Sequence, residues 1–125
     1  MIALAKHIET GQAGEALAQA FLKRKGYRIL ETNWRFSKAE VDIIAIHEHT
    51  LVFVEVKTRS SDRYGQPEEF ISDYKERLLA DAASVYMEQI EHEAAIRFDV
   101  IAIVYRSAED YHITHFEDAF FPGLE

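Results

Sequence analysis

The sequence predicts an α/β domain in which a mixed β-sheet is flanked by helices, in the element order α-β-β-β-α-β-β. Two segments repeat apolar residues every three or four positions, one near the N-terminus and one after residue 70. Three segments rich in β-branched and aromatic residues lie between them, and two more follow the second. Helices and strands that succeed one another in this way are typical of a sheet covered by helices.

The helices are predicted at residues 10–25 and 72–91. Thr10 and Ser72 are the expected N-caps, and Gly26 follows a basic last turn of the first helix. The second helix carries an apolar residue at every fourth position. The apolar stripe of the first helix comprises Ala13, Leu17, Ala20 and Phe21.

The strands are predicted at residues 27–36, 40–46, 51–58, 96–105 and 111–116. The short polar turn at residues 47–50 favours an antiparallel hairpin of the second and third strands. The fourth strand is nearly continuous in apolar residues, which predicts a central position with both faces buried. Residues 59–69 contain Gly65 and Pro67 and are expected to form a loop.

The length of 125 residues fits one domain spanning 1–125, with no internal repeat. The absence of cysteine excludes disulfides and thiolate metal sites, which agrees with a cytoplasmic location. The first residues hold too short an apolar run for a signal peptide, and no stretch is long enough to cross a membrane. We therefore expect a cytoplasmic protein without a membrane partner.

The net charge of −8 is unusual for a protein that binds nucleic acid, because phosphate contacts normally require a basic surface. The charge is unevenly distributed, however. Residues 1–63 hold 10 Lys and Arg against 8 Asp and Glu, whereas residues 64–125 hold 4 against 14. The first half is therefore compatible with a local basic face.

Acidic residues share faces on two neighbouring predicted strands. Residues two apart in a strand point to the same side, so Glu40 lies beside Asp42, and Glu55 lies beside Lys57. If the two strands pair about 4.8 Å apart, the carboxylates of Asp42 and Glu55 meet. The alternate positions are expected to pack together in the core: Val41, Ile43, Ala45, Val52, Val54 and Val56.

Two adjacent carboxylates repel each other unless a cation lies between them. Hard cations such as Mg²⁺ or Mn²⁺ accept one or two carboxylates together with water and phosphate oxygens. Lys57 would then neutralise the charge that develops on a phosphate. The combination predicts a phosphodiester hydrolase, although a structural salt bridge on a half-exposed sheet face explains any one of these residues alone.

Asp42, twelve intervening residues and then Glu55-Val-Lys57 resemble the D…(D/E)xK signature of the restriction-endonuclease-like superfamily. The chain is similar to one group in particular, the YraN family of uncharacterised bacterial proteins, which resembles archaeal Holliday junction resolvases. The residues carrying this resemblance are Gly11-Gln-Ala-Gly14-Glu15-Ala16, Gly26-Tyr27, Asn33-Trp34-Arg35, Glu40-Val-Asp42-Ile-Ile, Phe53-Val-Glu55-Val-Lys57-Thr-Arg59, Lys75 and Arg97-Phe-Asp99-Val. One departure is Ala39, where the family usually has Gly.

The resemblance implies a restriction-endonuclease-like fold, metal ligation by Asp42 and Glu55, and a catalytic role for Lys57. It also implies a nucleic-acid partner, with DNA favoured over RNA, and it allows a homodimer. Glu15 would match an acid on the first helix of the resolvases. Yet Glu15 lies about 160° around the helix from Leu17, so the alternative, an acid that favours the helix dipole, stays open.

Several other residues have two interpretations each. Glu40 is a further metal ligand or a solvated acid at a strand end. The cations Arg35, Arg59 and Lys75 contact nucleic acid or simply face solvent. Trp34 and Phe36 stack on bases or pack in the core. We expect Arg97 and Asp99 to pair with each other or to cap the sheet, and His47, His49, His112 and His115 to be ordinary surface residues.

Three functions follow from these observations. The first is a metal-dependent nuclease that acts on branched or otherwise structured nucleic acid. The second is a non-catalytic nucleic-acid-binding module of the same fold, against which the intact Asp42, Glu55 and Lys57 set argues. The third is a protein-interaction scaffold, which the charge of −8 favours.

Overall fold

The computed structural model describes residues 2–60 and 71–120, and their side chains from residue 9 onward. The described elements follow the predicted order, which confirms the α-β-β-β-α-β-β arrangement. They are α1 (Ile2–Arg24), β1 (Arg28–Phe36), β2 (Ala39–His47), β3 (Thr50–Arg59), α2 (Asp73–Gln89), β4 (Ile96–Ser107) and β5 (Asp110–Phe120). Within the described ranges, no helix is both long and apolar enough to cross a membrane.

The five strands form one mixed sheet in the spatial order β1-β2-β3-β4-β5. The pairs β1–β2, β2–β3 and β4–β5 are antiparallel, whereas β3–β4 is parallel. The β2–β3 hairpin is therefore confirmed. A parallel neighbour cannot follow through a tight turn, and here the chain passes from β3 to β4 by way of α2.

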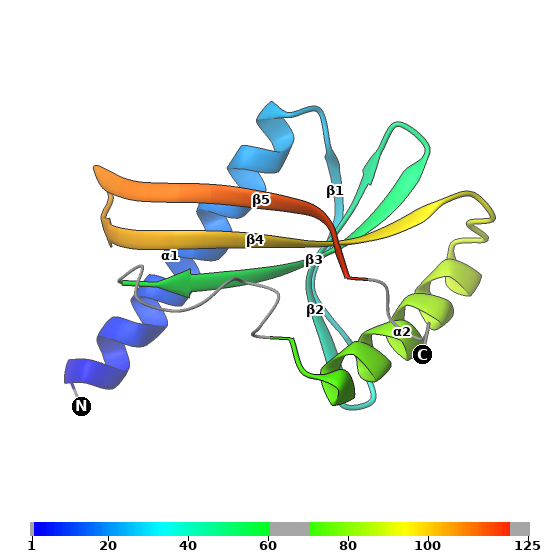
Figure 1. Ribbon diagram of the computed structural model, residues 1–125, viewed down its shortest axis with the longest axis horizontal. Coiled ribbons are helices and arrows are strands. Elements are labelled where there is room, and N and C mark those ends of the chain that lie inside the picture. Colours follow the sequence, from blue (N-terminus) through cyan, green and yellow to red (C-terminus); the bar gives the residue numbers. More distant parts are fainter. Residues whose placement is uncertain (1, 61–70, 121–125) are drawn as a thin grey trace.

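The sheet is covered on both faces, with α1 on one side and α2 on the other (Figure 1). We call the two apolar layers the α1-side core and the α2-side core. The α1-side core contains Ala18, Leu22, Tyr27, Ile43, Ala45, Val52, Val54, Ile101 and Ile103. The α2-side core contains Ala39, Val41, Ile44, Leu51, Phe53, Leu79, Ala82, Ala83, Tyr86 and Phe98. Burial of β4 from both sides explains its nearly continuous apolar sequence, although the middle strand is β3.

The two arms of the β2–β3 hairpin part after a few residues. Pairing runs from His47 and Thr50 to Ile43 and Val54. Beyond that point β2 continues beside β1, and β3 continues beside β4 as far as Arg59. Figure 1 shows the result, with β1 and β2 turning away from β3, β4 and β5. The main-chain pairing of β2 with β3 therefore ends at Ile43 and Val54.

The ends of some elements differ from the sequence prediction. Helix α1 begins at Ile2, so Thr10 is not its N-cap, and β5 reaches Phe120 rather than residue 116. Ser72 is the N-cap of α2 as predicted, and its Oγ accepts a hydrogen bond of 3.1 Å from the Lys75 backbone N–H. The loop predicted at 59–69 falls largely in residues 61–70, which lie outside the described ranges.

The expected alternation along β2 breaks at Asp42. Val41 packs in the α2-side core, whereas Ile43 packs in the α1-side core, although a regular strand would place them on one face. On the neighbouring β1, Asn33 has a positive φ of 51° at the position between the pairs that flank Asp42. The prediction that Val41 shares a core face with Ile43 is therefore wrong, because the backbone is locally twisted there.

Helix α1 approaches β3 closely at Gly14. A Cβ atom at this position would lie 1.9 Å from the Oγ1 atom of Thr58, which is far inside van der Waals contact. A Cβ atom at Gly11, one turn earlier, would meet nothing within 4 Å. Gly14 thus sets the distance between α1 and the strand that carries Glu55 and Lys57.

We expect Gly14→Ala to lower the free energy of unfolding by about 1–3 kcal/mol, because the helix or Thr58 must move. The matched control is Gly11→Ala, which should raise the stability by up to about 1 kcal/mol through helix propensity alone. Urea unfolding followed by circular dichroism measures both. Equal effects of the two substitutions would contradict the close approach.

Candidate functional site

The parting of β2 and β3 gives Asp42 an unusual backbone partner. Its Oδ2 accepts a hydrogen bond of 2.7 Å from the backbone N–H of Val56, a residue of β3 beyond the last hairpin pair. The carboxylate of Asp42 therefore replaces the main-chain acceptor that a longer hairpin would have provided. This contact fixes the carboxylate at the point where the two strands part.

Glu55 lies on the α2 side of β3 and is 6% exposed. Its Oε1 is 3.6 Å from Nζ of Lys57, two residues along the same strand face, and 2.5 Å from Nζ of Lys75 on α2. The predicted proximity of Glu55 and Lys57 is therefore observed. The sequence suggested an anionic partner for Lys75, because basic residues are disfavoured in the first turn of a helix. In the folded chain one such partner is Glu55.

Asp42 and Glu55 are close enough to influence each other. Burial is the largest cause that raises the pKa of Asp42, to about 7, and the negative charge of Glu55 is the next. The Val56 N–H and the ammonium of Lys75 act in the opposite direction. A carboxyl group that holds its proton up to neutral pH is typical of paired acids in a low-dielectric site.

Glu15 lies nearer to this site than the helical stripe suggested. The fully buried row of α1 includes Ala18 and Leu22, one position after the predicted stripe members Leu17 and Phe21, which are only partly buried. This offset turns the helix by about 100° and brings Glu15 towards the sheet. Its Oε2 lies 3.5 Å from Nδ2 of Asn33, and its charge contributes to the raised pKa of Asp42.

The remaining predicted site residues lie further from the carboxylate pair or have other contacts. Glu40 forms an ion pair of 2.8 Å with Arg35, whose side chain is 75% exposed. Nη1 of Arg59 donates to the carbonyl of Thr58 at 3.1 Å. Among the side chains that the structure describes, those of residues 9–60 and 71–120, no three His, Asp or Glu residues converge as a possible metal-binding group. The role of Glu40 as a further metal ligand therefore stays a prediction.

The donor set where β2 and β3 part consists of two carboxylates and two ammonium groups. Mg²⁺ commonly binds through one or two carboxylates and keeps water or phosphate oxygens as its other ligands, so the pair Asp42 and Glu55 fits such an ion. A cation would also relieve the repulsion that raises the pKa of Asp42. Lys57 and Lys75 supply positive charge beside it, which suits a phosphate ligand.

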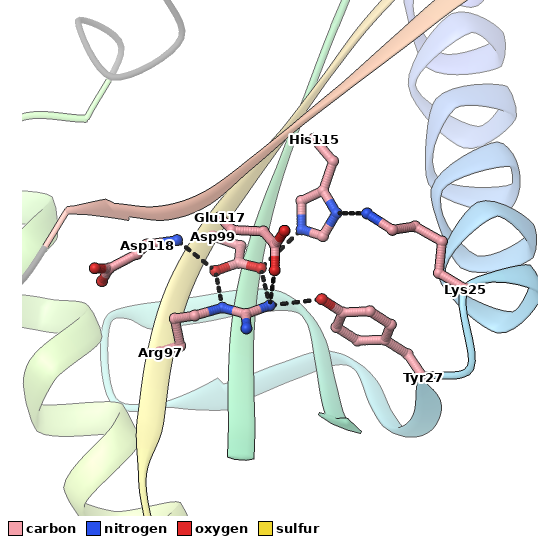
Figure 2. Close-up of polar contacts among 7 residues, drawn as sticks. All are labelled: Lys25, Tyr27, Arg97, Asp99, His115, Glu117 and Asp118. Atoms are coloured by element: carbon pink, nitrogen blue, oxygen red, sulfur yellow. Dashed lines mark hydrogen bonds and ion pairs between the residues drawn. The ribbon is translucent and has the colours of Figure 1, made fainter. Parts of the chain in front are cut away.

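A second polar cluster lies around the buried carboxylate of Asp99, which is 0% exposed (Figure 2). Nε and Nη2 of Arg97 donate to its two oxygens at 2.8 Å, and Nε2 of His115 contacts Oδ2 at 2.7 Å. On the other side of the imidazole, Nζ of Lys25 lies 2.8 Å from Nδ1. Nη2 of Arg97 also donates to the hydroxyl of Tyr27 at 2.6 Å.

This Asp99 cluster joins the end of α1, the start of β1 and the two strands β4 and β5. The predicted pairing of Arg97 with Asp99 is confirmed. The prediction that His115 is an ordinary surface residue is wrong, because its side chain is 3% exposed. The sequence offered one signal for its burial: His115 is two residues from Ile113, on the same face of β5.

The fold and the site together define a small mixed α/β protein with paired acids and lysines at the point where two strands part. Residues 14–103 match the family described as "Uncharacterised protein family UPF0102". The chain belongs to this family, which is the YraN family that its motifs resemble.

Several UPF0102 proteins are similar to this chain over nearly their whole length. One from Flavobacterium psychrophilum is 50% identical over 118 residues, which cover 94% of this chain and 98% of the relative. One from Bacteroides thetaiotaomicron is 40% identical, with coverage of 97% and 99%. One from Thermodesulfovibrio yellowstonii is 44% identical, with coverage of 91% and 97%.

The raised pKa of Asp42 predicts a pH-dependent effect of Asp42→Asn in the presence of a chelator. The unfolded chain releases this proton near pH 4, whereas the folded chain holds it to about pH 7. The wild type therefore loses stability relative to the variant as the pH rises through this range. We expect nearly equal stabilities at pH 4, and a variant more stable by roughly 2–4 kcal/mol at pH 8.

Urea unfolding at both pH values measures this difference, and Asp99→Asn is the matched control. Burial works to raise the pKa of Asp99, but hydrogen bonds from Arg97, His115 and the Asp118 N–H outweigh it and hold the pKa below its ordinary value. Asp99→Asn should therefore destabilise the protein at pH 8. A loss of stability at pH 8 in Asp42→Asn would show that the charged form of Asp42 does not destabilise the folded protein.

Proposed function

We propose that this protein is a metal-dependent nuclease that hydrolyses phosphodiester bonds in branched or otherwise structured nucleic acid. The observation that carries the proposal is the pair Asp42 and Glu55 at the parting of two strands, with Lys57 and Lys75 in contact with Glu55. The D…ExK spacing and the resemblance to Holliday junction resolvases support the same chemistry. DNA is the favoured substrate.

Each side chain has a separate role in this proposal. Asp42 and Glu55 would hold Mg²⁺ or Mn²⁺, and the hydrogen bond from Val56 keeps Asp42 oriented before the metal arrives. Lys57, with its side chain 19% exposed, would bind a non-bridging phosphate oxygen and stabilise the charge that develops during hydrolysis. When bound, the divalent cation would supply Lewis-acid activation of the phosphate and of the attacking water.

Lys75 has two roles in succession. In the metal-free protein its ammonium neutralises Glu55. A cation held by Glu55 would repel this ammonium, which would then be available to a phosphate oxygen of the substrate. The lysine is thus an internal counter-ion that keeps the paired acids stable until metal and substrate are present.

The first test is calorimetry with Mg²⁺ and Mn²⁺ on the wild type and on the double variant Asp42→Asn/Glu55→Gln. We expect the wild type to bind metal and the folded variant to lose binding by at least about tenfold, because both carboxylates are removed. Cleavage of branched and single-stranded substrates should disappear in parallel. If neither protein binds metal, even with nucleic acid present, the nuclease proposal loses its mechanism, and a binding module or an interaction scaffold takes its place.

The counter-ion role of Lys75 gives an independent prediction. Lys75→Met should raise the Mn²⁺ affinity of the substrate-free protein by about tenfold, or about 1.4 kcal/mol, because a competing positive charge at Glu55 is removed. Lys75→Arg keeps this charge and should leave the affinity within about twofold. Calorimetric titration measures both, and weaker metal binding in Lys75→Met would refute the role.

A further inference from the structure

A cavity of about 350 Å³ lies between the β1–β2 turn and the first two turns of α2. Lys38, Ala39 and Glu40 line one side, and Tyr74, Lys75 and Leu78 line the other. The volume is within the range of sites that take a small organic group. Apolar and polar side chains both contribute to its lining, which suits a flat ring that carries hydrogen-bonding edges.

The cavity and the candidate site share one residue, Lys75. This residue lines the cavity, and its Nζ lies 2.5 Å from Oε1 of Glu55. A group bound in the cavity would therefore lie beside the lysine that contacts Glu55. Lys38 adds a second positive charge, while the negative charge of Glu40 is balanced by Arg35 at 2.8 Å. With Glu40 balanced by Arg35, the two lysines favour a ligand group that lies beside a phosphate.

Aromatic surface is exposed at this cavity. The side chain of Tyr74 is 53% exposed although it is large and partly apolar. A second exposed aromatic, Phe36, pairs across the β1–β2 turn with Ala39, one of the cavity residues. Exposed aromatic rings beside lysine side chains, here Lys38 and Lys75, are typical of surfaces on which nucleic-acid bases stack. Only a base released from pairing can present its face and enter a cavity of this size.

We propose that this cavity holds the base of an unpaired nucleotide next to the phosphate bound by Asp42, Glu55 and Lys57, with Tyr74 as the stacking residue. The proposal rests on the proposed function for the position of the phosphate. It specifies the substrate class further: nucleic acid with an unpaired base beside the scissile bond, as at a branch, a flap or a single strand. A continuous duplex does not offer such a base.

The cavity at the other end of α2 has different chemistry. It measures about 550 Å³ but is lined by Glu88, Glu91 and Glu93 together with Met87 and His92. Three carboxylates repel a phosphate chain, so this larger cavity does not suit nucleic acid. The smaller cavity is therefore preferred because of its charge and because one of its residues, Lys75, contacts Glu55.

The test is fluorescence anisotropy with a labelled 12-nucleotide oligothymidine and with a blunt 12-base-pair duplex at low salt. Titrations are made in chelator and repeated with Ca²⁺, so that binding is measured apart from cleavage. We expect Tyr74→Ala to weaken single-strand binding by about 5- to 100-fold, the usual effect of one lost stacking contact, and to leave duplex binding within about twofold. Tyr74→Phe should bind as the wild type does.

Tyr111→Ala is the matched control, since Tyr111 is an exposed tyrosine on β5, 40% exposed, outside the cavity. An oligonucleotide with 2-aminopurine at one position gives a second measurement. Stacking on Tyr74 should quench its fluorescence in the wild type and in Tyr74→Phe, and not in Tyr74→Ala. Thermal melts establish that each variant is folded, which an exposed position should permit.

Unchanged single-strand binding in Tyr74→Ala, an equal loss for duplex, or no single-strand binding by the wild type in either condition would overturn the proposal. The nuclease proposal is judged separately, by metal calorimetry and cleavage. If the protein binds metal and cuts nucleic acid but Tyr74→Ala has no effect, the nuclease proposal stands and the base-binding proposal fails. If the protein binds no metal but needs Tyr74 to bind single strands, the base-binding proposal stands and the nuclease proposal fails.

Discussion

The hydrogen bond from the backbone of Val56 to the carboxylate of Asp42 holds together the point where the sheet divides. Strand β3 leaves β2 after Val54 while it continues beside β4, and the backbone N–H of Val56 then has no main-chain acceptor on β2. Asp42 satisfies that group, and in doing so it is brought beside Glu55 and desolvated. The charged site is therefore a consequence of the sheet topology.

The buried carboxylates of Asp99 and Glu55 lie on opposite faces of adjacent strands and have different polar partners. Both carboxylate oxygens of Asp99 accept hydrogen bonds from Arg97, and His115 and the Asp118 N–H also contact this carboxylate. Together these contacts outweigh burial and hold the pKa of Asp99 low. Glu55 is met by two flexible lysines at a single oxygen. A rigid, fully satisfied network favours a structural role, whereas side chains that can move away leave a carboxylate free to exchange partners.

Local patterns predicted much of the site. Residues two apart in a strand share a face, so Glu55 and Lys57 were assigned together correctly, and the polar turn after His47 indicated the hairpin. The same rule misplaced Val41, because the twist beside Asn33 interrupts the alternation. The role of Lys75 could not be derived, since its contact with Glu55 joins residues 20 positions apart on different elements.

The sequence by itself determined the order of helices and strands, the family and the acidic and basic residues of the candidate site, because periodicity and motif spacing are properties of short segments. Tertiary structure alone decided which residues meet. Helix α1 is turned so that Glu15 lies towards Asp42 while Gly14 lies close to Thr58, and the buried His115 contacts Asp99 from another strand. Such contacts arise from packing between elements, which no local pattern encodes.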